Sequence, residues 1–274
     1  MSRPDTRRLR LLGITLAVAL LLGVGGYAVF SHFRPYLHGS NCEVRTAQGK
    51  ESLDLEQAAN SATIAAVAFR KNLPERAVVI AYATAIQESH LHNLAEGDRD
   101  SVGLFQQRPS QGWGAVEQLR DPVYASGRFF DSLKKVKDYL DRDLHDAAQR
   151  VQRSADGTAY ARHEDEGKVM AQAYTGRIPA AVRCWFSPDK RTKPRRAEAI
   201  LELRRAFGRL ILTGDAVMVG GRRGGWSVAS WGVSHAQAYG LTEVRYAGKR
   251  WTAENGYAGW VTDDKAPKDR VIIR

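Results

Sequence analysis

The chain has 274 residues and a net charge of +11, from 41 lysines and arginines against 30 aspartates and glutamates. This length allows one large domain or two small ones, and we expect two. The sequence contains no glycine-rich phosphate loop and no Gly-x-Ser-x-Gly elbow, which argues against phosphate-loop nucleotidases and α/β-hydrolases.

The N-terminal segment predicts a membrane anchor. Residues 11–30 contain no charged side chain, and they are about long enough to cross a bilayer as one helix. Residues 1–10 carry four arginines against one aspartate, so they should form a cytoplasmic basic tail. The protein would then be a single-pass protein of the cell membrane, with the bulk of the chain extracytoplasmic. A cleaved signal peptide is the alternative, although its apolar region is usually shorter.

The next segment, residues 31–50, is polar and without periodicity, and it predicts a short stalk. Asp54 and Gln57 then have the spacing of a capping box, and the apolar residues from Leu55 to Phe69 mark one face of a helix. We expect this helix to open a domain that covers residues 51–184.

A central helix is predicted from Ala77 to Leu91. Its first ten residues carry no charge and only two hydroxyl groups, so the helix should be buried on all sides. Glu88 lies near its end, where partial burial and the negative end of the helix dipole both favour a protonated carboxyl group. Cleavage of a glycosidic bond requires such an acid, because the leaving oxygen must receive a proton. Glu88 is therefore the candidate catalytic residue, and a solvated glutamate at a helix end is the alternative.

Two motifs give the region a family resemblance. Glu88-Ser89 followed by Gly103-Leu-Phe-Gln106 resembles the Glu-Ser and Gly-Leu-Met-Gln motifs of the lytic transglycosylase and goose-type lysozyme superfamily. The run Phe-Gln-Gln-Arg-Pro-Ser-Gln-Gly-Trp-Gly over residues 105–114 is similar to lysozyme-like domains of actinobacterial membrane proteins and phage tail proteins. The resemblance covers about Leu53 to Gly176, and it implies a lysozyme-like domain that acts on peptidoglycan.

The segment from residue 97 to 107 predicts a turn and a short hairpin that form one wall of the cleft. The resemblance implies that Gln106 binds the N-acetyl group of an amino sugar and that Ser89 helps to set the acid and its reaction partner. The alternative for Ser89 is a serine at a helix end whose hydroxyl bonds back to a backbone carbonyl. Gln107 should alternate to the other face of a strand. Trp113 is expected either to stack on a sugar ring or to close the core.

A tyrosine hydroxyl that contacts the acid is also implied by the resemblance. In the transglycosylases a late Ala-Tyr-Asn motif supplies it, whereas here Ala173-Tyr174-Thr175 has threonine in place of asparagine. Tyr160 and the run that begins at Gln152 are rivals for the same place. The residue that meets the acid therefore stays open between Tyr174, Tyr160 and Gln152. These three residues are expected to bind substrate, together with Ser89, Gln106 and Trp113.

A hydrolase would need a second carboxylate, at about 5 Å from the acid in a retaining enzyme and about 6.5–9.5 Å in an inverting one. Asp98 and Asp100 are the nearest candidates in the motif region, and both also suit ordinary turn positions. A lytic transglycosylase needs no second carboxylate, because the substrate's own N-acetyl group can stabilise the cation. The resemblance therefore favours transglycosylation over hydrolysis.

The cysteines and histidines complete the list of candidate site residues. Cys42 and Cys184 bracket the region of resemblance, and outside the cytoplasm they should form a disulfide bond, with two buried thiols as the alternative. His90 and His92 stand two residues apart, a spacing that does not direct both rings at one ion on a helix. We therefore expect no metal and no cofactor.

The C-terminal third is expected to be a separate module. Residues 185–196 contain two prolines and several basic side chains and predict a linker, and residues 197–274 predict a small basic α+β module. Residues 183–274 hold 18 basic against 9 acidic side chains. Outside the membrane, such a charge would meet anionic wall polymers or lipid headgroups rather than nucleic acid.

The expected fold is thus α+β: one N-terminal transmembrane helix, a mainly α lysozyme-like domain, and a small α+β C-terminal module. The expected function is cleavage of the β-1,4 bond between N-acetylmuramic acid and N-acetylglucosamine in peptidoglycan glycan strands. The alternative is a non-catalytic glycan-binding or scaffolding protein of the cell envelope or of a secretion apparatus, which the altered Thr175 slightly favours.

Overall fold

The computed structural model describes residues 15–16, 19–27, 29, 38–153 and 157–274. It divides the chain into two compact units, residues 1–39 and residues 40–274. In the first unit the described residues between 15 and 29 are helical and exposed. No helix in the described part of the chain is long and apolar enough to cross a membrane. The expected anchor over residues 11–30 lies only partly within the described residues, and the expected tail over residues 1–10 lies outside them.

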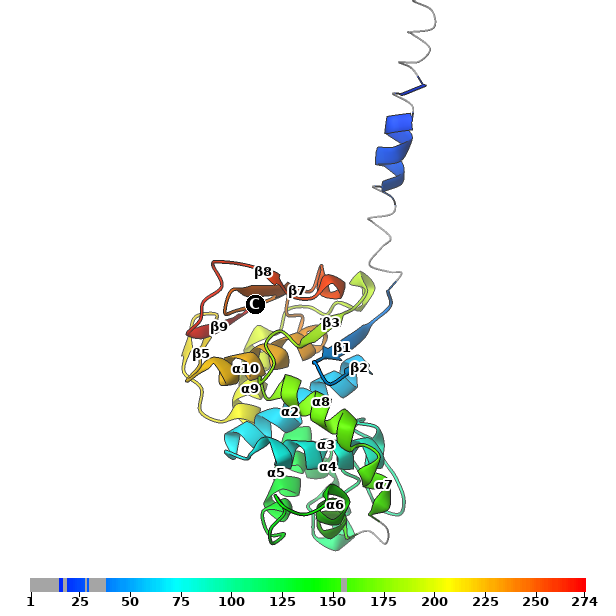
Figure 1. Cartoon of the computed structure of the whole chain (residues 1–274), viewed down its shortest axis with the longest axis vertical. Coiled ribbons are helices and arrows are strands. Elements are labelled where there is room, and N and C mark those ends of the chain that lie inside the picture. Colours follow the sequence, from blue (N-terminus) through cyan, green and yellow to red (C-terminus); the bar gives the residue numbers. More distant parts are fainter. Residues whose placement is uncertain (1–14, 17–18, 28, 30–37, 154–156) are drawn as a thin grey trace, which may run out of the picture. The chain divides into compact units, whose positions relative to one another are not determined.

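The described residues are about 49% helical and 14% strand, which confirms the α+β class (Figure 1). The α-helices in the described part of residues 40–274 are α2 (Leu55–Arg70), α3 (Glu75–Ser89), α4 (Val116–Leu119), α5 (Pro122–Leu133), α6 (Leu144–Gln152), α7 (Thr158–Ala161), α8 (Glu164–Tyr174), α9 (Arg196–Phe207), α10 (Arg222–Ser234) and α11 (Ala236–Tyr239). The strands are β1 (Asn41–Arg45), β2 (Lys50–Leu53), β3 (Val182–Trp185), β4 (Leu212–Thr213), β5 (Ala216–Met218), β6 (Glu243–Tyr246), β7 (Lys249–Thr252), β8 (Val261–Thr262) and β9 (Arg270–Ile273).

A small antiparallel sheet in the order β2-β1-β3 opens the second unit. Cys42 on β1 stands directly opposite Cys184 on β3, and the two form a disulfide bond with their Cα atoms 4.0 Å apart. The expected disulfide is therefore confirmed. The expected stalk over residues 31–50 is wrong from Asn41 onward, because β1 and the start of β2 lie within it.

Strand β1 carries a buried charged residue, Glu43, and for this reason the sequence did not predict a strand there. Glu43 stands between the two buried residues Cys42 and Val44, and its own side chain is only 6% exposed. Burial alone would raise its pKa, but the hydrogen bonds from Lys50, Arg183 and Arg45 outweigh that effect and hold the pKa of Glu43 at about 2. The basic residues that balance Glu43 include Lys50 on β2 and Arg183 on β3, which are distant in the sequence or unrecognisable as partners before the strands pair.

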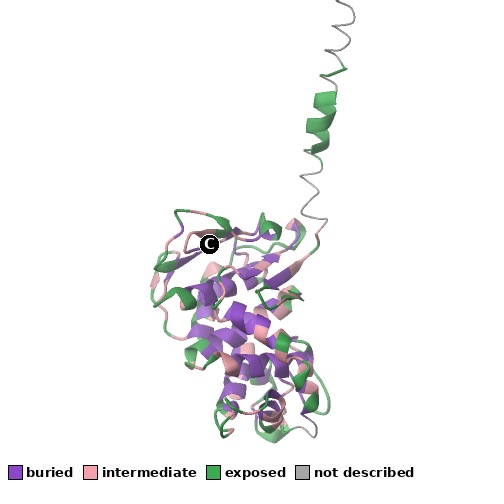
Figure 2. Cartoon of the chain, viewed as in Figure 1, coloured by how far each residue is buried: buried purple, intermediate pink, exposed green. Residues whose placement is uncertain are grey.

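The first two helices of this unit form as expected. The carboxylate of Asp54 accepts a hydrogen bond from the backbone N–H of Gln57 at 2.8 Å, and the Gln57 side chain accepts one from the Asp54 N–H at 2.8 Å. This is the predicted capping box, and it starts α2. Every residue of α3 from Ala77 to Ile86 is buried (Figure 2). The prediction of a central helix buried on all sides is confirmed.

The C-terminal third contains a six-stranded antiparallel sheet in the order β4-β5-β9-β6-β7-β8. Helix α10 packs against this sheet and also against α2 and α8, so it lies between the sheet and the first helices (Figure 1). Trp226 and Trp231 on α10 are fully buried there. The Ser227 hydroxyl donates a hydrogen bond to the backbone carbonyl of Tyr174 on α8 at 2.8 Å.

This packing differs from the expected division into a domain over residues 51–184, a linker over 185–196 and a separate module over 197–274. Residues 40–274 form one compact unit, and one hydrophobic core runs through both expected parts. The sequence predicted a small α+β module over residues 197–274. It did not predict that α2 supplies part of the surface against which α9 and α10 pack.

Candidate active site

The candidate acid, Glu88, lies in the last turn of α3. The helix ends there because His90 adopts a left-handed conformation with φ of 50°, and its backbone N–H bonds back to the carbonyl of Ile86. The preceding turns are held in the core, whereas Glu88 is half-buried. A helix that is buried from Ala77 to Ile86 therefore presents one carboxylate at its partly exposed end.

Tyr160 is the tyrosine that contacts this acid. Its hydroxyl donates a hydrogen bond to Oε1 of Glu88 at 2.6 Å, although the two residues are 72 positions apart. Tyr160 lies on the short helix α7, and its side chain is buried. A short hydrogen bond from a neutral donor to a carboxylate both orients it and stabilises its negative charge.

The rival tyrosine, Tyr174, has a different place. It is 1% exposed within α8, and its ring meets the ring of Tyr82 on α3 edge to face, with centroids 6.3 Å apart. The next residue, Thr175, donates a hydrogen bond to Glu75, at the opposite end of α3 from Glu88, and accepts one from Arg223 on α10. Tyr174 is therefore a core residue, and its assignment to substrate binding is corrected.

A polar groove of about 610 Å³ adjoins Glu88. Its lining includes four of the expected residues besides the acid: Asp98, Gln106, Trp113 and Gln152. The other lining residues are Arg99, Ser101, Gln107, Arg108, Gln111 and Arg153. Five of the eleven lining residues are therefore candidates that the sequence predicted.

Gln106 is held by a tight loop in the groove wall. Its side-chain N–H donates to the carbonyl of Gly103 at 3.1 Å, and its Oε1 accepts a hydrogen bond from the Ser101 hydroxyl at 2.8 Å. Gly97 makes room for this amide, because a Cβ atom at that position would lie 1.6 Å from Oε1 of Gln106. The loop therefore fixes an amide group that can both donate and accept hydrogen bonds.

The neighbouring Gln107 also lines the groove, in contrast to the expected alternation. Gln106 has a φ of 46°, so the chain turns at this residue and does not continue as an extended strand. The predicted hairpin is reduced to a single antiparallel bridge between Val102 and Gln107. Gln107 is 2% exposed, and its side-chain N–H donates to the carbonyl of Ala125 at 3.3 Å.

Ser89 does not line the groove, so its assignment to substrate binding is also corrected. It is buried, and its hydroxyl lies 3.0 Å from the carbonyl of Ala85 and 2.7 Å from that of Leu104. The single hydroxyl proton can be donated to either carbonyl. The contact with Leu104 ties the end of α3 to the loop that carries Gln106, which makes Ser89 a positioning residue.

Gln152 and Trp113 close the groove on two other sides. The Gln152 side-chain N–H donates to the backbone carbonyl of Phe105 at 2.7 Å, so α6 is also tied to the Gln106 loop. Trp113 is 6% exposed, and its backbone carbonyl accepts a hydrogen bond from the Tyr124 hydroxyl at 3.3 Å. Of the two expected roles, this burial favours closure of the core, although Trp113 also lines the groove.

The two aspartates proposed as a second carboxylate have different environments. Asp100 accepts hydrogen bonds from the Arg108 guanidinium at 2.6 Å and from the backbone and hydroxyl of Ser110. These contacts, led by the one from Arg108, hold the pKa of Asp100 well below its usual range. Asp98 does line the groove, but its side chain is 93% exposed and 3.8 Å from Arg99.

Three arginines in the groove were not predicted. Arg99 and Arg108 stand within the motif region, and Arg153 directly follows Gln152. The only sequence signal for them was their position beside the predicted site residues. Arg108 is paired with Asp100 and Arg99 lies 3.8 Å from Asp98, so carboxylates balance two of these positive charges.

The chain was compared with known protein families and with curated proteins, and neither comparison finds a match.

Proposed function

We propose that this protein is a membrane-anchored, extracytoplasmic glycosidase that cleaves the β-1,4 bond between N-acetylmuramic acid and N-acetylglucosamine in peptidoglycan. The contact that carries this proposal is the 2.6 Å hydrogen bond from Tyr160 to Glu88, at the edge of a groove lined by amide side chains. The resemblance of residues 88–89 and 103–106 to the lytic transglycosylase and goose-type lysozyme superfamily adds support. The lysozyme-like fold is part of the proposal.

In the first step Glu88 acts as the general acid. Its proton passes to the glycosidic oxygen as the bond to C1 of the muramic acid breaks, and the departing sugar gains a hydroxyl group. The side-chain amide of Gln106, fixed by Ser101 and Gly103, suits the N-acetyl group of the sugar, since an amide can pair with another amide as donor and acceptor. Tyr160 then stabilises the carboxylate that remains on Glu88.

In the second step Glu88 acts as the base. The N-acetyl oxygen of the substrate stabilises the cation at C1, and the C6 hydroxyl of the same sugar attacks C1 as Glu88 removes its proton. The product is a 1,6-anhydro sugar, and Glu88 is again protonated for the next cycle. No water and no second carboxylate takes part.

The aspartates near the groove support transglycosylation over hydrolysis. An inverting hydrolase needs a carboxylate at about 6.5–9.5 Å that can remove a proton from water. Asp100 is engaged by Arg108 and Ser110 and does not line the groove. Asp98 is almost fully exposed and beside Arg99, which suits a solvated turn residue.

The location at the membrane rests on residues 11–30. Within the described part of this segment, large apolar side chains are exposed to between 59% and 73% of their area. Apolar residues of this kind, preceded by an arginine-rich tail, suit a helix that is covered by lipid. The positive charge of residues 183–274 would then face anionic wall polymers or lipid headgroups.

The direct test is digestion of purified peptidoglycan by the full chain, followed by mass spectrometry of the released sugars. We expect products with a 1,6-anhydro terminus, which are one water lighter than the reducing products of a hydrolase. Glu88→Gln should abolish release, whereas Glu96→Gln, at an exposed position outside the groove, should not. Products with reducing termini would indicate that the protein is a hydrolase and not a transglycosylase. No release by any form would favour the non-catalytic glycan-binding or scaffolding protein.

A further inference from the structure

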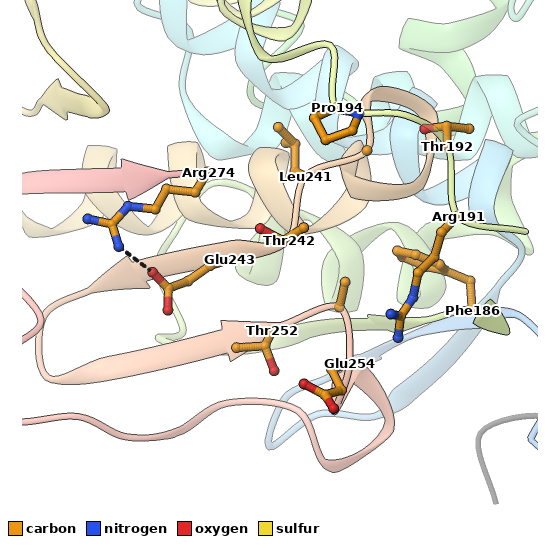
Figure 3. Close-up of a pocket in the computed structure, with 12 residues that line it drawn as sticks. Phe186, Arg191, Thr192, Pro194, Leu241, Thr242, Glu243, Thr252, Glu254 and Arg274 are labelled. Atoms are coloured by element: carbon orange, nitrogen blue, oxygen red, sulfur yellow. Dashed lines mark hydrogen bonds and ion pairs between the residues drawn. The ribbon is translucent and has the colours of Figure 1, made fainter. Parts of the chain in front are cut away.

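A second hollow lies in the C-terminal half, away from the lining of the Glu88 groove. It has a volume of about 530 Å³, which is within the range of about 300–1,000 Å³ for small-molecule pockets. The segment after β3, the strands β6 and β7, and Arg274 surround it (Figure 3). None of its lining residues belongs to the groove beside Glu88.

The floor of this hollow is apolar and its rim is charged. Phe186, Leu241 and Ala253 line it and are at most 7% exposed. Arg191 and Glu254 stand at the rim as exposed residues. In Figure 3 both are on the same side of the hollow as Phe186.

The charges at the rim differ in whether they are paired. At the opposite side of the hollow, Arg274 and Glu243 are joined at 3.2 Å (Figure 3). Within the described part of the chain, the side chains of Arg191 and Glu254 have no ion-pair or hydrogen-bond partner, and they are not paired with each other. One cation and one anion are therefore both available to a ligand in the same hollow.

We infer that this hollow binds a short peptide that carries both a free carboxylate and a free amine. A guanidinium group matches a carboxylate with two parallel hydrogen bonds, and a glutamate accepts hydrogen bonds from an ammonium group. A ligand with only one of these charges would leave the other rim charge without a partner. Small side chains such as the methyl group of alanine fit against Phe186, Leu241 and Ala253.

The source of such a peptide follows from the proposed function, on which this step rests. The stem peptides on the muramic acid of peptidoglycan carry free carboxylates, free amines and alanine side chains. A protein that holds a stem peptide in this hollow and a glycan strand beside Glu88 would recognise both components of the same polymer. The hollow then adds selectivity for strands that still carry their peptides.

The test uses the full chain and a defined probe, the tripeptide L-alanyl-γ-D-glutamyl-diaminopimelic acid, titrated by calorimetry. We expect binding that weakens by about tenfold or more in Arg191→Gln and in Glu254→Gln, since each variant removes one charge-assisted contact. A tripeptide with acetylated amines and amidated carboxylates should bind the wild-type chain as weakly as the unmodified tripeptide binds these two variants. Arg209→Gln and Glu117→Gln, which change exposed charges outside the hollow, serve as matched controls.

Two outcomes would overturn the inference: no binding to the wild-type chain, or equal binding by the four variants. Failure of the proposed function is separate, because Glu88→Gln should bind the tripeptide as the wild type does. Tripeptide binding without any glycan cleavage would support the peptide site and refute the proposed glycosidase activity. Glycan cleavage without tripeptide binding would support the glycosidase activity and refute the peptide site.

Discussion

His235 should make the stability of this protein depend on pH. Its imidazole is 6% exposed at the end of α10 and stacks on Trp231, with centroids 3.9 Å apart. Nδ1 lies 3.0 Å from the Trp231 carbonyl, and Nε2 lies 3.4 Å from the Thr63 hydroxyl on α2. The neutral ring satisfies both contacts, because Nδ1–H donates to the carbonyl and Nε2 accepts from the hydroxyl.

The size of this pH effect on the free energy of unfolding follows from the difference between the pKa of His235 in the folded and unfolded states. Burial, only partly offset by the Trp231 carbonyl, lowers the pKa of His235 to about 4, whereas an unfolded chain has a histidine pKa of about 6.5. Below pH 6.5 the unfolded chain therefore binds a proton that the folded chain does not. The free energy of unfolding falls as the pH falls, by about 3 kcal/mol between pH 6.5 and pH 4. Above pH 6.5 this contribution is constant.

The measurement is urea unfolding of the full chain at pH 7, 6, 5 and 4.5, for the wild type and for His235→Gln. The variant should be less stable at pH 7, because it loses the stacking on Trp231, but its stability should fall less steeply with pH. Thr63→Val is the matched control, since it removes a contact of the ring and keeps the titrating group. Parallel slopes for the wild type and His235→Gln would refute the linkage.

Three further predictions concern the site and its support. Tyr160→Phe should lower glycan cleavage about 10- to 100-fold with little loss of stability, because it removes only the hydroxyl that contacts Glu88, and kinetics on purified peptidoglycan would show this. Gly97→Ala should weaken glycan binding about tenfold by displacing the amide of Gln106, as measured by sedimentation with cell walls. Reduction of the disulfide, which spans 142 residues, should lower the free energy of unfolding by about 4–5 kcal/mol in urea.

Each of these predictions has a control. Tyr139→Phe, at a partly buried tyrosine on no wall of the groove, should keep wild-type cleavage, and equal losses in both tyrosine variants would deny Tyr160 its role. Gly220→Ala should leave glycan binding unchanged, because nothing lies within 4 Å of the added Cβ. If Gly97→Ala also binds normally, Gln106 does not contact the sugar. Equal urea midpoints with and without reductant would show that the disulfide adds no stability.

The sequence predicted best the features that depend on nearby residues. The capping box of Asp54 and Gln57 and the buried helix from Ala77 to Ile86 involve contacts within one or two helical turns, and both are confirmed. The disulfide is a distant contact, but only two cysteines occur, so only one pairing within the chain is available.

Features that depend on distant pairing were missed or left open. Tyr160 and Tyr174 have similar local sequences, and only the fold brings one of them to Glu88. Strand β9 inserts between β5 and β6, and no local pattern specifies that order. The position of Gln107 was also missed, because the chain turns at Gln106 and does not continue as an extended strand. For Ser89 the bond back to the Ala85 carbonyl was one of the two expected roles, and only its contact with the Leu104 carbonyl was missed.

The packing of α10 on α2 changes the expected role of the C-terminal third. An independent wall-binding module could be removed without harm to the catalytic region. Here α2 packs against α3 and α5 and also against α9 and α10. The turn at Gly176, after α8, lies so close to α10 that a Cβ atom at position 176 would be 2.0 Å from the Arg223 carbonyl oxygen. The C-terminal third therefore supports the helix layer that holds Glu88, while its exposed lysines and arginines remain available to anionic polymers.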